Sequence, residues 1–310
     1  MAKHDIIVVG ASAGGVEAVQ KLVRELPGTM PAVLFVVMHL SPRTRSYLAE
    51  ILTRAGHLAA IQAEDNMPIQ PGRIYVAPPD YHLIIERDHI HVSLGPKEQH
   101  QRPSINVTFR SAALAYVDRV VGVVLTGDMD DGTSGLWEIK RRGGIAVVQN
   151  PEEAIFPSMP LSALREIEVD YTVNLPEMGP LLCRLAFEDG DRKRPLAEVT
   201  NMEPRLTDLT CPDCRGTIWE VPRGTSSEYR CRVGHSYSAK TMLAEHFSTQ
   251  EKALYSAVVA LEEGSSLAKR LVDKLDPQFR EPLLEEAGNR EREAETLKKL
   301  LENRRSFSIE

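Results

Sequence analysis

Apolar and polar positions alternate in blocks over the first part of the chain. Short β-branched runs, such as Ile6–Val9 and Val33–Val37, are followed by stretches with apolar residues at helical spacing, of which 16–26 is the first. Continuous apolar runs of this length are typical of strands buried on both faces of a parallel sheet. The alternation therefore predicts a doubly wound, mostly parallel α/β sheet.

Two further strand-like segments depart from this pattern. His82–Glu86 and Ile90–Leu94 are separated by a short polar turn. This spacing predicts an antiparallel hairpin inserted into the α/β domain. We expect the histidines of this region to lie at the surface: His82, His89 and His91.

A polar, turn-rich stretch at 188–195 ends the first block. We expect an α/β domain over 1–187, a linker over 188–206, a small ribbon-like module over 207–238 and helices over 239–310.

The last of these regions carries a seven-residue apolar repeat, made by Phe247, Leu254, Leu261, Ala268 and Leu275. Prolines at 277 and 282 interrupt it, and a second helix is expected from about 283 to 304. The pattern fits an antiparallel helical hairpin or, equally, the seam of a coiled-coil homodimer.

Charge and hydropathy limit the partners of the chain. Its 44 acidic and 37 basic residues give a net charge of −7, and no long basic block is present. Nucleic acid is therefore not an expected partner. No apolar stretch approaches the roughly 20 residues that span a bilayer, and no secretory signal is evident. We expect a cytoplasmic protein that does not insert into membranes.

The first strand runs into a glycine turn, Gly10-Ala11-Ser12-Ala13-Gly14-Gly15, and a helical segment follows. Such a turn lies at the carboxyl edge of the sheet, where it either cradles a phosphate or presents a nucleophile. The dinucleotide fingerprint needs a glycine where Ser12 stands, and an acidic residue about 20 positions later. His39 follows the next strand instead, which favours the nucleophile.

Three strand ends together offer the groups of a serine hydrolase. Ser12 follows the first strand, His39 the second, and Asp128, Asp130 and Asp131 follow the strand at 120–126. A serine hydroxyl needs a neighbouring base, and the base needs an orienting acid. Each residue also has a structural interpretation, as a turn serine, a structural histidine or a helix N-cap.

Several motifs in the same order resemble the catalytic domain of the chemotaxis protein-glutamate methylesterase family, over about residues 4–185. They are the Ser12 turn, His39, 71–78, 102–107, 123–127 with Asp131-Gly132, 149–151 and 158–160. The resemblance implies hydrolysis of γ-glutamyl methyl esters on cytoplasmic helices of chemoreceptors, and in some members deamidation of glutamines. It also implies Ser12 as nucleophile, His39 as general base and Asp131 as the orienting acid, with Asp130 as the alternative, and no cofactor for catalysis.

The chain departs from the family pattern at two positions. Ala13 and Asp128 stand where the family often has threonine and methionine, and both are near the expected oxyanion site. Regulated members carry an N-terminal receiver domain, and we expect no such switch in this polypeptide. Arg43 and Arg102 are expected to contact the acidic receptor helix.

A second constellation has the spacing of a metal site. Cys211 and Cys214 form one knuckle, and Cys231 and His235 form another. Three cysteines and a histidine fill the four positions of a structural zinc. A disulfide or a redox Cys-x-x-Cys are the alternatives, which reducing surroundings and the second knuckle disfavour. Cys183 is expected to be an ordinary core cysteine.

Two other functions remain open at this point. One is a signalling scaffold, in which the serine domain is a degenerate binding module and the ribbon and helices recognise partners. The other is a hydrolase of an unrelated small ester.

Overall fold

A computed structural model describes residues 4–41, 45–187, 203–223, 226–274 and 276–303. The chain divides after Thr241 into two compact units. Most of the expected linker, residues 188–202, lies outside the described residues.

The first unit is built on a seven-stranded sheet whose order is β10-β9-β8-β1-β2-β5-β3, with every pairing parallel. Its strands are β1 (Ile6–Ala11), β2 (Val33–Met38), β3 (Ala59–Gln62), β5 (Arg73–Val76), β8 (Val120–Val124), β9 (Ile145–Gln149) and β10 (Tyr171–Val173). The predicted doubly wound α/β sheet is confirmed.

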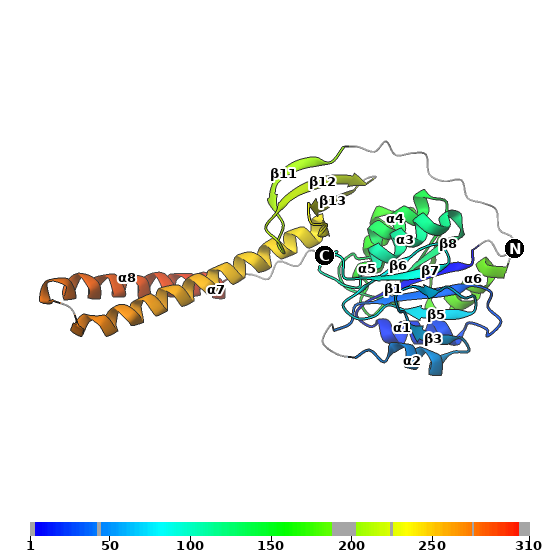
Figure 1. Ribbon diagram of the computed structural model, residues 1–310, viewed down its shortest axis with the longest axis horizontal. Coiled ribbons are helices and arrows are strands. Elements are labelled where there is room, and N and C mark those ends of the chain that lie inside the picture. The colour runs from blue at the N-terminus through cyan, green and yellow to red at the C-terminus, as the bar shows by residue number, and fades with distance from the viewer. Residues whose placement is uncertain (1–3, 42–44, 188–202, 224–225, 275, 304–310) are drawn as a thin grey trace. The chain divides into compact units, whose positions relative to one another are not determined.

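Two helical layers cover this sheet (Figure 1). One layer comprises α1 (Gly15–Arg24), α2 (Leu48–Ala55) and α6 (Leu175–Phe187), and the other α3 (Ile105–Tyr116), α4 (Thr133–Arg141) and α5 (Ser158–Glu166). Successive residues of a strand point to opposite faces. Ile7 and Val9 therefore enter one core while Ile6 and Val8 enter the other, which is why β1 is apolar throughout.

The inserted hairpin is also confirmed. β6 (His82–Ile85) pairs with β7 (His89–Ser93), and the short β4 (Met67–Pro68) adds a third antiparallel strand.

The expected surface position of His82 is wrong, because only 2% of this residue is exposed. Its Nε2–H donates to the Pro96 carbonyl at 2.9 Å, and its Nδ1 accepts from the Ser104 amide at 3.2 Å. Burial lowers the pKa of His82, so the ring stays neutral and keeps this bonding pattern. The side chains of His89 and His91 are exposed.

A four-stranded antiparallel sheet, the ribbon, completes the first unit. Its strands follow one another in chain order: β11 (Arg205–Thr210), β12 (Thr217–Arg223), β13 (Ser226–Cys231) and β14 (Ser236–Ser238).

The second unit is an antiparallel pair of helices from one chain. α7 (Ala239–Leu271), which begins in the first unit, leads through η2 (Val272–Lys274) to α8 (Pro277–Glu302). Ser265 on α7 donates to Glu291 on α8 at 3.0 Å. The pairing of these helices therefore needs no second chain.

One boundary of the helical region differs from expectation. The second helix begins at Pro277, not near 283. A proline is tolerated at the first helical position, because the N–H that it lacks would have no partner within the helix. Of the seven-residue repeat, Ala268 is buried, Phe247 is 36% exposed and Leu275 lies outside the described residues.

None of the helices in the described ranges is long and apolar enough to cross a membrane.

Close contact between α3 and α4 depends on a glycine. A Cβ at Gly135 would lie 2.6 Å from Phe109 Cβ and 3.0 Å from the Asn106 backbone. We expect Gly135→Ala to lower the free energy of unfolding in urea by about 1–3 kcal/mol, because the helices must separate. The neighbouring Ser134→Ala adds no atom and should change it by less than about 0.5 kcal/mol. Equal effects of the two substitutions would contradict this account.

Candidate active site and metal centre

The Ser12 side chain stands at the carboxyl edge of the sheet because β1 ends one residue earlier. The Ser12 amide donates to the Thr126 carbonyl at 3.0 Å, and the Gly15 amide donates to the Ser12 carbonyl at 2.9 Å. Gly14, with a φ of 72°, turns the chain into α1. A left-handed backbone of this kind favours glycine.

Thr126 and Gly127 hold this turn from the end of β8. The Thr126 hydroxyl donates to the Ala13 carbonyl at 3.1 Å and accepts from the Phe156 amide at 2.9 Å. A Cβ at Gly127 would lie 2.7 Å from Ser12 Cβ and closer still to the Met159 sulfur. The loop that carries Asp128, Asp130 and Asp131, here called the aspartate loop, can therefore pass close to the serine turn only with a glycine at position 127.

His39 follows β2 as Ser12 follows β1, and the register pairs Ala11 with Met38. The two side chains are therefore neighbours along one edge of the sheet. His39 Nδ1 lies 3.1 Å from Ser12 Oγ, and His39 Nε2 lies 2.8 Å from Asp131 Oδ2. The structure thus brings together all three residues of the expected Ser-His-Asp set.

The carboxylate of Asp131 is 2% exposed and is surrounded by donors. They are His39 Nε2, the Ser104 hydroxyl and the amides of Ile105, Asn106 and Gly132, at 2.8–3.0 Å. Burial alone would raise the pKa of Asp131, but the bond from His39 and those from the α3 amides outweigh it, and the pKa is lowered.

An ionised Asp131 decides the tautomer of the imidazole. A carboxylate can only accept, so His39 Nε2 must carry the proton. His39 Nδ1 is then left with a lone pair directed at the Ser12 hydroxyl. This is the arrangement that a general base for serine requires.

The aspartate loop and α3 cap each other. Asp131 accepts the first amides of α3, while Asn106 Oδ1 on α3 accepts the amides of Gly132 and Gly135 at the start of α4, at 3.0 and 2.7 Å. Free helix N-termini favour such acceptors. Ser104 and Asn106 lie within the motif at 102–107, but the sequence did not predict either of these roles. Ser104 stands directly before Ile105, where α3 begins, and a serine at such an N-cap position is the signal that could have identified it.

The alternative acid, Asp130, points elsewhere. It is buried and accepts from the Thr241 hydroxyl at 3.2 Å, and burial raises its pKa. Asp128, which replaces the family methionine, is exposed.

Of the two arginines expected to contact the receptor helix, the structure describes only Arg102. Arg43 lies outside the described residues. Arg102 donates twice to Asp80 and once each to the carbonyls of Leu94 and Gly95, at 3.0–3.1 Å. Four of its five N–H donors are thus used within the protein.

Donors for an oxyanion are available beside Ser12. Within the described residues, the amides of Ala13 and Gly14 donate no hydrogen bond, and α1 begins immediately afterwards. Unpaired amides at a helix N-terminus stabilise negative charge.

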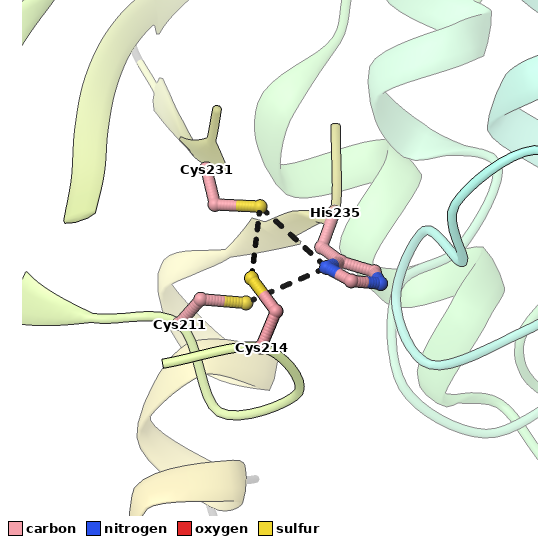
Figure 2. A group of neighbouring side chains, drawn as sticks. All are labelled: Cys211, Cys214, Cys231 and His235. Atoms are coloured by element: carbon pink, nitrogen blue, oxygen red, sulfur yellow. Dashed lines mark hydrogen bonds between the residues drawn. The ribbon is translucent and has the colours of Figure 1, made fainter. Parts of the chain in front are cut away.

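The four residues of the second constellation also converge (Figure 2). Cys214 Sγ lies 3.7 Å from Cys231 Sγ, and His235 Nδ1 lies 3.6 Å from Cys211 Sγ and 3.5 Å from Cys231 Sγ. Tetrahedral zinc would separate sulfurs by about 3.8 Å and sulfur from nitrogen by about 3.6 Å. The donor set therefore fits zinc, whereas a disulfide requires sulfurs about 2.05 Å apart.

The surroundings of this site suit a metal as well. His235 Nε2 faces the Asp213 carboxylate at 4.0 Å, and Asp213 accepts from the Tyr237 hydroxyl at 2.8 Å. A carboxylate behind a ligating histidine orients the ring and raises its basicity. Cys183 lies apart, half-buried, with its sulfur 3.8 Å from the Met30 sulfur.

Known proteins resemble the part of the chain that carries Ser12, His39 and Asp131. A family described as CheB methylesterase matches residues 7–182. A Leptospira interrogans relative, provisionally named a protein-glutamate methylesterase/protein-glutamine glutaminase, is 39% identical over 183 residues, which are 59% of this chain and 95% of the relative. A Methanosarcina mazei protein-glutamate methylesterase/protein-glutamine glutaminase is 33% identical over 59% of this chain and 52% of its own length.

Among solved structures, the catalytic domain of the Thermotoga maritima CheB methylesterase aligns with a TM-score of 0.57 and 30% identity. The alignment covers 58% of this chain and 98% of that domain. The ribbon and the helical hairpin lie beyond the residues that the family matches.

The Ser104 hydroxyl can be tested by its effect on stability. Because the pKa of Asp131 is lowered from 3.8, ionisation of this carboxyl stabilises the fold above pH 3.8, and that contribution is lost as the pH falls below it. Ser104→Ala removes one donor to the buried charge, so we expect the free energy of unfolding at pH 7 to fall by about 1.5–3 kcal/mol. Urea titrations at decreasing pH should show this deficit shrinking below 3.8. A deficit that does not change with pH would contradict the assignment.

Proposed function

The chain belongs to the CheB methylesterase family, and from this premise we propose that it is a protein-glutamate methylesterase with Ser12, His39 and Asp131 as its catalytic triad. The observation that carries the proposal is the continuous bonding from Ser12 Oγ through the His39 ring to the buried Asp131 carboxylate. The substrates are methylated glutamates on the cytoplasmic helices of chemoreceptors or receptor-like signalling proteins, so the enzyme acts in the cytoplasm.

In the first step, Ser12 Oγ attacks the ester carbonyl carbon and His39 Nδ1 takes the hydroxyl proton. Asp131 stabilises the imidazolium that forms, since the carboxylate already accepts from its other nitrogen. The amides of Ala13 and Gly14 are the donors for the tetrahedral oxyanion.

In the second step, the carbon–oxygen bond to the methoxy group breaks and His39 Nδ1 returns its proton to the departing methanol. Water, activated by the same nitrogen, then releases glutamate from the acyl-serine. A glutamine side chain would follow the same course with ammonia as the leaving group. The names of the relatives support this second activity.

We further propose that Cys211, Cys214, Cys231 and His235 hold a structural zinc. The match between their separations and a tetrahedral ligand set supports this. Four protein ligands leave no open position, so the metal would supply folding energy to the ribbon and take no part in the hydrolysis.

Release of methanol from a methylated receptor fragment tests the esterase. We expect Ser12→Ala and His39→Ala each to lower the rate by at least about 10⁴-fold, because nucleophile and base act as a unit. Ser256→Ala, at an exposed serine of α7, is the matched control and should keep the wild-type rate. Hydrolysis of generic esters without methanol release would indicate a different ester substrate. Receptor binding with neither activity would indicate a scaffold.

Metal analysis of the purified chain tests the ribbon site. We expect about one zinc per chain, and at least about tenfold weaker retention against a chelator in Cys214→Ser, because a thiolate ligand is lost. Cys183→Ser removes a thiol outside the cluster and should retain zinc normally. Equal zinc loss from both variants, or a zinc-free wild type, would refute the site.

A further inference from the structure

The segment from Leu94 to Ser104 contacts both the ribbon and the active site. Gln99 and His100 have φ values of 52° and 60°, a backbone that costs non-glycine residues about 1–3 kcal/mol and needs support from its surroundings. The ribbon supplies that support. The Gln99 amide donates to the Ser236 carbonyl at 2.8 Å, and the Gln99 side chain accepts from the Ser238 amide at 3.1 Å.

The same segment ends at the hydroxyl that binds Asp131. Only three residues separate His100 from Ser104, which donates to the carboxylate. The backbone held by the ribbon therefore sets the start of α3 and, with it, three of the donors to Asp131.

A buried ion network joins α3 to the ribbon. Arg110 of α3 pairs with Glu98 and lies 3.6 Å from Glu228 of β13. Burial would raise the pKa of Glu228, but Arg223, Arg110 and Arg230 lower it to about 2. The ionised Glu228 resists separation from these arginines, because breaking the contact leaves uncompensated buried charge.

A second connection reaches the aspartate loop directly. Asp130, next to Asp131, accepts from the Thr241 hydroxyl at 3.2 Å. The Ser238 hydroxyl accepts from the Thr241 amide at 3.0 Å and so caps the start of α7. Thr241 is 3% exposed, so water does not compete for this bond.

The contacts of Gln99 and of Thr241 both involve serines that flank Tyr237, and Tyr237 contacts the metal-ligand cluster. This fully buried residue lies between Ser236 and Ser238, and its hydroxyl contacts Asp213 at 2.8 Å and Cys211 Sγ at 3.3 Å. The His100 ring packs on the Tyr237 ring with 5.2 Å between centroids.

We infer that the ribbon, closed by its metal, is a positioning element for the catalytic aspartate: it holds the Asp130–Asp131 loop through Thr241 and the start of α3 through Gln99 and Arg110. The ribbon touches no reacting atom. The inference rests on the proposed triad, because it assigns the ribbon a role in aligning Asp131 with His39.

The decisive variant is Thr241→Val, which keeps the shape of the side chain and removes the bond to Asp130. Thr241→Ser, which keeps the hydroxyl, is its matched control. With a small chromogenic ester as substrate, we expect kcat of Thr241→Val to fall about 10-fold with KM unchanged, since small displacements of an aligned group reduce turnover strongly. Thr241→Ser should have the same kcat as the wild type.

The low-field proton resonance of His39 Nε2–H, bonded to Asp131, gives a readout independent of turnover. We expect it to shift or broaden in Thr241→Val and on removal of zinc from the full chain with a chelator, and to return when zinc alone is added back. If stripped protein and Thr241→Val both keep the wild-type resonance and kcat while their melting temperatures fall, the ribbon only stabilises the fold and the inference is wrong. Should wild-type protein hydrolyse no ester, the proposed function fails, and the resonance still decides whether the ribbon positions Asp131.

Discussion

The proposed active site depends on the hydrogen bonds that the buried Asp131 carboxylate accepts. A buried charge is tolerated only when hydrogen bonds replace the lost water, and this one has five donors. These donors join His39, the start of α3 and the start of α4 at one point. In turn, the side chain of Asn106 on α3 accepts the amides of Gly132 and Gly135 at the start of α4. The helix packing on one face of the sheet and the alignment of the proposed triad therefore share a single set of interactions.

Parallel pairing explains why residues far apart in the chain meet at this point. Ser12 and His39 follow paired residues of neighbouring strands, and Asp131 follows the strand on the other side of β1. The glycine at position 127 lets the aspartate loop approach the serine turn closely. Because Ser12 and His39 each directly follow a strand buried on both faces, their backbone is anchored by both cores.

Much of this was predictable from the sequence, because buried parallel strands leave continuous β-branched runs and glycine turns mark their carboxyl ends. Spacing alone did not choose between Asp130 and Asp131, since adjacent carboxylates differ only in which way the folded loop turns each side chain. The burial of His82 was missed for a similar reason: its partners, Pro96 and Ser104, come from a segment without a periodic pattern. The second helix began earlier than expected because Pro277 starts it and Pro282 is accommodated inside it.

Three of the five groups that hold Asp131 are main-chain amides. Only a substitution by proline removes a main-chain N–H. Most side-chain substitutions at these three positions therefore leave the amide donors to this carboxylate in place. The orientation of the carboxylate then depends on residues that shape the path of the backbone, such as Gly127 and Gly132, as well as on the side chains that contact the acid.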